Sequence, residues 1–136
     1  MSKEQEVQEK YYALQLGVAQ LEELNRQSAL LQNKIAELMI LESALLDLQK
    51  TKSKTKIFSA LGSGIYVAAE ILNTDSVLIN VGANVFVKKP IEEAIFLIKD
   101  QRSQTESLFV ELEKTAQNLQ QQILKLQKDL QNVQIS

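Results

Sequence analysis

Apolar residues recur with a helical period along both ends of the chain. In the C-terminal part, positions at alternating steps of four and three are apolar in eleven of thirteen cases. These positions are Ile91, Ile95, Ile98, Arg102, Thr105, Phe109, Leu112, Ala116, Leu119, Ile123, Leu126, Leu130 and Val133. A heptad pattern of this length predicts a coiled-coil helix over residues 90–136.

The N-terminal part predicts a second coiled-coil helix over residues 1–50. Its apolar positions fall into two runs: first Val7, Tyr11, Leu14, Val18 and Leu21, then Leu24, Ser28, Leu31, Ile35, Leu38 and Leu45, with Leu41 and Leu48 alongside. The step from Leu21 to Leu24 shifts the phase by three residues. Such a shift, a stammer, predicts a locally overwound supercoil.

The two helices have matched lengths, which predicts an antiparallel pair. A chain reversal between them would place Leu48 beside Ile91 at one end and Val7 beside Val133 at the other. Each helix could then bury the seam of its partner, which a single long helix cannot do alone.

Residues 51–89 separate the helices and predict two β-hairpins. Runs rich in Ile, Val, Phe and Tyr occupy residues 56–61, 64–72, 76–81 and 84–88. Tight-turn sequences, Gly62-Ser63-Gly64 and Gly82-Ala83-Asn84, join the runs into two hairpins, and Asn73-Thr74-Asp75 is the expected turn between the hairpins. The expected fold class is therefore α+β: a long antiparallel two-helix coiled coil with a central insert of two hairpins.

The hairpin strands are apolar on both faces, which predicts an oligomerisation module. Isolated hairpins are marginally stable and exposed apolar edges aggregate, so pairing with other subunits is the simplest cover. The residues expected at this interface are Ile65, Val67, Val77, Ile79, Val81, Val85 and Val87. Ile40, Leu46, Phe96 and Leu97 leave the seam next to the insert, where packing against the β region is expected.

Composition argues against enzymatic chemistry. The chain has no Cys and no His, which removes thiol nucleophiles, imidazole bases and the usual soft metal ligands. We therefore expect a protein that is not an enzyme and has no cofactor or metal. Lack of Cys fits a reducing compartment, and we read no signal peptide or membrane span, so a cytoplasmic location is expected.

Net charge is −2, which disfavours nucleic-acid binding. Four lysines, however, alternate with Ser and Thr before the first strand: Lys50, Lys52, Lys54 and Lys56. A solvated linker is the favoured interpretation, and a phosphate-binding run is the alternative.

The insert resembles that of prefoldin subunits of the alpha class, of the archaeal type. The similarity is carried by Leu61-Gly62-Ser63-Gly64-Ile65-Tyr66-Val67, Val77-Leu78-Ile79-Asn80-Val81-Gly82-Ala83-Asn84, Val85-Phe86-Val87-Lys88-Lys89 and Glu92-Glu93-Ala94. Two hairpins are typical of the alpha class, since beta-class subunits have one.

This resemblance implies a chaperone subunit that works without ATP. Two alpha-type and four beta-type subunits would form a hexamer on a shared β-barrel. Unfolded clients would be held between coiled-coil tips and passed to a group II chaperonin. Nucleic acid and membrane are not implied partners.

Four apolar residues outside the seam suit client capture at the tips. They are Tyr12, Leu16, Leu124 and Ile135. Scattered surface hydrophobes are an equally simple interpretation. A structural coiled-coil adaptor without clients, and a nucleic-acid-binding assembly using the lysine run, remain as alternative functions.

Overall fold

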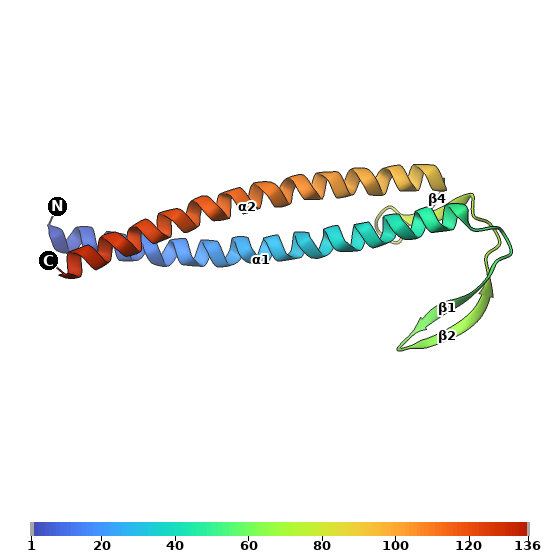
Figure 1. Cartoon of the computed structure of the whole chain (residues 1–136), viewed down its shortest axis with the longest axis horizontal. Helices are drawn as coiled ribbons and strands as arrows, with labels where there is room; N and C mark the ends of the chain where they lie inside the picture. The colour runs from blue at the N-terminus through green and yellow to red at the C-terminus, as the bar shows by residue number, and fades with distance from the viewer. Residues whose placement is uncertain (1, 136) are drawn as a thin grey trace. The chain divides into compact units, whose positions relative to one another are not determined.

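The computed structural model describes residues 2–135 of the chain and the side chains of residues 2–133. Its elements, in order, are α1 (Lys3–Lys50), β1 (Lys56–Gly62), β2 (Ile65–Glu70), β3 (Ser76–Asn80), β4 (Phe86–Pro90) and α2 (Ile91–Ile135). Along the chain, two antiparallel hairpins, β1–β2 and β3–β4, thus follow the first long helix and precede the second (Figure 1). The predicted fold class is confirmed.

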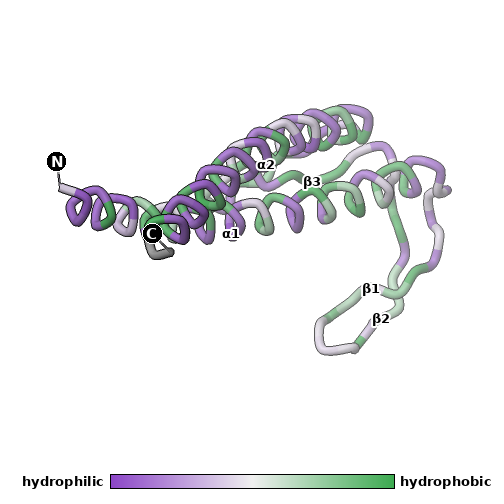
Figure 2. The backbone as a smooth tube through the Cα atoms, turned by 60° about the vertical axis from the view of Figure 1, so that its left-hand side comes forward, coloured by the Kyte–Doolittle hydropathy of each residue, from purple (hydrophilic) through white to green (hydrophobic). Residues whose placement is uncertain are grey.

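The chain divides into two compact units. The terminal unit consists of Met1–Ile35 and Gln104–Ser136, and the hairpin unit consists of Ala36–Ser103. Within each unit, segments of α1 and α2 run antiparallel side by side (Figure 1). Along both helices, hydrophilic and hydrophobic stretches alternate from turn to turn, as a two-helix seam requires (Figure 2).

The seam of α1 in the terminal unit keeps an unbroken heptad spacing. Its buried or partly buried positions are Val7, Lys10, Leu14, Gly17, Leu21, Leu24, Ser28, Leu31 and Ile35. The predicted stammer is therefore wrong. Gly17 stands in the seam where Val18 was expected, and Lys10 stands where Tyr11 was expected. Lys10 fits because its apolar stem packs while its ammonium lies 3.7 Å from Asp129.

Gly17 lets the two helices approach closely. A Cβ at this position would lie 3.1 Å from Cγ1 of Ile123, which is buried. We expect Gly17→Leu to destabilise the terminal unit by about 1–3 kcal/mol, because the added side chain overpacks the seam. Thermal unfolding followed by circular dichroism measures this loss. Ile123→Ala in the same chain should restore part of it, and an equally stable Gly17→Leu single variant would contradict the close packing.

The hairpin unit holds a core where the hairpin β3–β4 meets the helices. Leu45, Ile91, Ala94 and Ile95 are buried, and five partly buried residues pack against them: Leu46, Leu48, Val77, Ile79 and Ile98. The predicted neighbourhood of Leu48 and Ile91 is confirmed. In the terminal unit, Val7 and Val133 line one small cavity, which confirms the antiparallel register there.

Each unit also has a polar pair in its seam. In the hairpin unit, Glu42 is buried, and its Oε2 lies 3.3 Å from Nη1 of Arg102. That oxygen has no hydrogen bond of good geometry, so the contact is an ion pair. In the terminal unit, the hydroxyl of Ser28 donates to Glu113 over 2.5 Å. Both pairs join α1 to α2 and sit where apolar residues usually lie.

The predicted turns and strands are observed within a few residues. Strand β1 pairs with β2 from Lys56↔Glu70 to Gly62↔Ile65, with an irregularity after Ala60. Strand β3 pairs with β4 from Ser76↔Pro90 to Asn80↔Phe86. Pro90 ends β4 instead of opening the helix, and the N–H of Ile91 donates to the carbonyl of Asp75 over 2.9 Å. This bond ties the start of α2 to the hairpin.

Three of the four off-seam residues near the insert are not packed against it. Leu46 contacts the core, as predicted. Ile40 and Phe96, however, are 71% and 68% exposed, and Leu97 is also exposed. The prediction is wrong for these three. The hairpin contributes only Val77 and Ile79 to the core, so residues on the outward sides of the helices stay uncovered.

Candidate functional site

The functional features of the chain are surfaces. Among the described side chains, those of residues 2–133, no group of three or more His, Cys, Asp or Glu could hold a metal ion. Hydrogen bonds from Arg26 and then Gln27 lower the pKa of Glu23 to about 2, but all three are exposed on one helix. These three side chains form a local surface cluster that offers no proton transfer near neutral pH.

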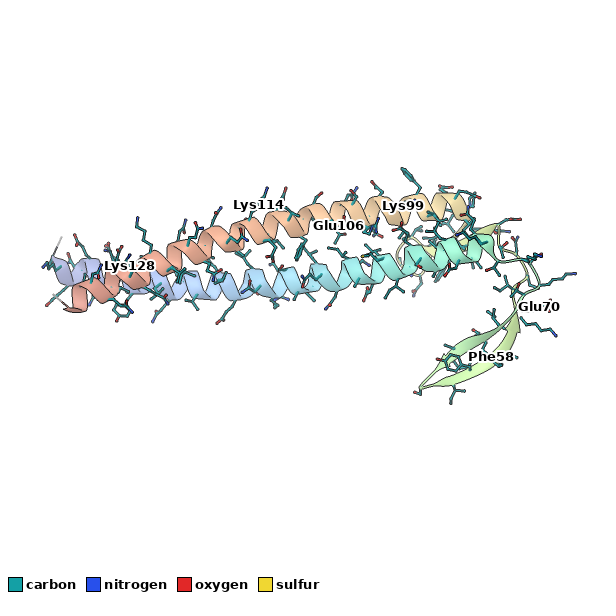
Figure 3. The ribbon with its side chains drawn as sticks, viewed as in Figure 1. Phe58, Glu70, Lys99, Glu106, Lys114 and Lys128 are labelled. Atoms are coloured by element: carbon teal, nitrogen blue, oxygen red, sulfur yellow. The ribbon has the colours of Figure 1, made fainter. Side chains whose placement is uncertain are left out.

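The hairpin β1–β2 exposes apolar side chains on both faces. Phe58 is 76% exposed, and Figure 3 shows its ring on this hairpin. Ile65 and Val67, both predicted interface residues, are 60% and 46% exposed. Leu61 and Tyr66 add further exposed apolar surface. Monomeric proteins rarely leave such a surface uncovered, so this hairpin fits a protein–protein contact.

The hairpin β3–β4 has one covered and one exposed face. Val77 and Ile79 are partly buried against the helices of the same chain, whereas Val87, which shares their face by register, is exposed. Val81 and Val85 lie next to the turn and are exposed. The interface role of these five predicted residues stays a prediction, and for Val77 and Ile79 the contact seen is with their own helices.

Leu78 and Phe86 form the exposed face of β3–β4. They are 69% and 58% exposed, and they were absent from the predicted interface set. Strand alternation places them opposite Ile79 and Val87. That alternation is the signal that could have found them, but the sequence alone does not say which face the helices cover.

The predicted tip residues are exposed where they are described. Tyr12 and Leu124 are 64% and 57% exposed, and Leu16 is 46% exposed. The side chain of Ile135 lies outside the described residues. Tyr12 borders a shallow groove with Gln5, Gln8 and Glu9.

The structure does not gather these residues into one patch. Leu16 and Leu124 lie at one level of the coil, because Gly17 lies opposite Ile123, whose Cγ1 would be 3.1 Å from a Cβ at position 17. A groove lined by Glu23 and Gln122 marks one side of the terminal unit. Leu16 precedes Glu23 by two helical turns and shares that side, whereas Leu124 is about 200° around the helix from Gln122 and faces the other side.

Two residues that the sequence assigned to the seam extend the apolar surface around Leu124. Tyr11 and Val18 are 43% and 39% exposed. Val18 lies about 200° from Gln20, which lines the groove, so it faces away from the groove, and Tyr11 lies one heptad before it. The unit therefore has an apolar side made by Tyr11, Val18 and Leu124. The sequence missed it because Gly17 and Lys10 were not expected in the seam.

No helix in the described part of the chain is long and apolar enough to span a bilayer.

Comparison with known proteins agrees with this architecture. The family model described as "Prefoldin subunit" matches residues 18–136. A prefoldin subunit alpha of Methanococcus vannielii is 27% identical over 129 residues, covering 95% of this chain and 82% of that protein. A prefoldin subunit alpha of Archaeoglobus fulgidus is 27% identical over 140 residues, covering 96% of this chain and 95% of the relative.

A solved structure has the same fold. The cryo-EM structure of filamentous PFD from Methanocaldococcus jannaschii aligns with a TM-score of 0.74 at 25% identity, over 85% of this chain and 95% of that one. The arrangement of helices and hairpins, the family model and the relatives all indicate the same family. The chain belongs to the prefoldin family of chaperones, as an alpha-class member.

Proposed function

We propose that this chain is a subunit of a holding chaperone that captures unfolded or nascent proteins without ATP. The observation that carries the proposal is a group of exposed apolar side chains toward the chain ends, which includes Tyr12, Leu16, Val18 and Leu124. They lie on helices that need no further partner to bury their seam, so they are available for contacts with clients.

Weak contacts in several copies suit reversible holding. Burial of one such side chain gives about 1–2 kcal/mol, which alone binds a client poorly. Several coils on one assembly raise the effective concentration of contacts, so a client is retained and can still leave without nucleotide hydrolysis. This arrangement requires that the chain assemble with other subunits.

The two hairpins are the proposed assembly module. Their uncovered apolar side chains, such as Phe58, Ile65 and Leu78, require cover. In this proposal two alpha-class and four beta-class subunits join their hairpins into a β-barrel, and the hexamer delivers clients to a group II chaperonin in the cytoplasm. Family membership supports these partners, and the proposal includes no cofactor, enzymatic activity, nucleic acid or membrane.

A client-free coiled-coil adaptor is the competing function. It shares the heptads and the hairpins, but it would gain nothing from exposed apolar residues near the chain ends. Suppression of the aggregation of a denatured model protein, in the absence of ATP, separates the two functions. A nucleic-acid-binding assembly would instead show binding that falls steeply with salt.

Replacement of Tyr12, Leu16, Leu124 and Ile135 by Ser or Gln tests the tip assignment. We expect the assembly with a beta-class subunit to keep its mass while client retention falls at least about tenfold, since each side chain contributes about 1–2 kcal/mol. Native mass spectrometry and an aggregation assay measure the two effects.

The matched control replaces four exposed apolar residues away from the chain ends: Leu30, Ile40, Phe96 and Leu108. This variant removes comparable apolar surface and should hold clients as well as the unchanged chain. An equal loss in both variants would show that client contacts are spread along the coil, and an unchanged tip variant would rule out the tip residues.

A further inference from the structure

The exposed face of the hairpin β3–β4 carries one charge among apolar neighbours. In the antiparallel register, Leu78 pairs with Lys88 and Asn80 pairs with Phe86. Leu78, Phe86 and Lys88 therefore share a face, with Leu78 and Phe86 as diagonal neighbours. The opposite face is partly occupied, since Val77 and Ile79 pack on the helices. Any subunit that covers this hairpin from outside must cover Lys88 as well.

Lys88 is the only ionisable residue on this face of the two described strands, whose other members there are Ser76, Asn80 and Pro90. It is exposed in the single chain. Burial of its ammonium against Leu78 and Phe86 would be costly unless the covering surface offers an acceptor. A carboxylate is the acceptor that offsets this cost best.

Carboxylates of the same region are placed elsewhere. Glu70 stands across the strand pair from Lys56, and Glu93 binds Lys89 over 2.8 Å. Asp75 directly precedes β3, and strand alternation places it on the same face as Val77. Residues 51–90 carry a net charge of +3. A second copy of this chain would thus bring a similarly basic hairpin region toward Lys88.

We propose that the face of Leu78 and Phe86 docks a hairpin of a different subunit, and that this hairpin presents a carboxylate to Lys88. Lys88 is then the residue that selects the acidic partner over a second copy of the chain. The inference rests on the proposed assembly through hairpins and adds the face used and the charge required of the partner. Like charges brought together at an interface weaken binding of the wrong partner, whereas opposite charges favour binding of the right partner.

Charge reversal at Lys88 tests this selection. The full chain is mixed with a beta-class prefoldin subunit from the same source, and the affinity is measured by sedimentation and native mass spectrometry. Lys88→Gln should weaken assembly by roughly tenfold, and Lys88→Glu by roughly a hundredfold or more. Raised salt should weaken the unchanged complex more than the Lys88→Gln complex.

Lys99→Glu is the matched control, because Lys99 is exposed on α2 and projects from that helix (Figure 3). It makes the same charge change in the hairpin unit and should leave assembly unchanged. If the Lys88→Glu variant loses its helical circular dichroism signal, the affinity of the Lys88→Gln variant for the beta-class subunit tests the role of Lys88 instead.

If the unchanged chain and both Lys88 variants bind the beta-class subunit with equal affinity, this inference alone is overturned. An unchanged chain that forms no complex with the beta-class subunit would overturn the proposed assembly and this inference together. Equal losses in the Lys88 and Lys99 variants would show a response to overall charge and would also overturn the role of Lys88.

Discussion

Deletion of residues 1–16 and 124–136 is expected to abolish client holding while the assembly survives. The deletion removes Tyr11, Tyr12, Leu16 and Leu124, which are exposed apolar side chains near the chain ends. It leaves both hairpins and the core around Leu45 and Ile91 untouched. The remaining seam is still several heptads long, so the shortened helices should stay paired.

The effect should exceed that of single substitutions, because the weak contacts of several side chains are lost from every alpha-class coil of an assembly at once. We expect suppression of client aggregation to fall by at least about tenfold at equal assembly concentration. Native mass spectrometry, with the mass corrected for the deleted residues, shows whether the oligomer persists.

An internal deletion provides the matched control. Residues 22–35 and 105–118 face each other in the antiparallel register, and each segment spans two heptads. Their removal shortens the coil by a similar length, keeps the seam in phase and retains the chain ends. The polar pair of Ser28 and Glu113 is removed as a whole. This variant should still hold clients; equal holding by the end-deleted variant would place client contacts outside the tips.

The sequence predicted the architecture well because two strong periodicities dominate it. Every seam position predicted for α2 from Ile91 to Leu130 is buried or partly buried. Tight-turn sequences at Gly62 and Gly82 placed both hairpins, where the structure has positive φ angles. These signals are local, so they can be read without tertiary contacts.

The seam of α1 was harder to predict because it contains small and polar residues. An apolar count favours Val18 over Gly17 and Tyr11 over Lys10, yet the structure buries the second member of each pair more deeply. Contact with Ile123 explains Gly17, and the reach of the Lys10 ammonium to Asp129 explains Lys10. Both reasons depend on the facing helix. The covered face of β3–β4 likewise depends on the helix ends, which strand alternation does not specify.

Glu42 and Arg102 should show strong coupling because Glu42 is buried in the seam. Its side chain is 12% exposed and that of Arg102 is 31% exposed. We expect Arg102→Leu to destabilise the chain by about 3 kcal/mol, because it leaves a carboxylate in the seam without its ion-pair partner. Glu42→Leu should cost less, since the long Arg102 side chain already reaches water and can extend further.

The double variant, Glu42→Leu with Arg102→Leu, should be about as stable as the unchanged chain or more stable, because an apolar pair replaces the desolvated ions. Thermal and denaturant unfolding of the four proteins, each with the same partner subunit at the same concentration, gives the coupling energy. A small loss for Arg102→Leu alone would indicate that water reaches Glu42. A double variant with the summed loss of both single variants would show that the two side chains act independently. The expected order, with Arg102→Leu least stable and the double variant restored, follows only if the buried carboxylate depends on its arginine.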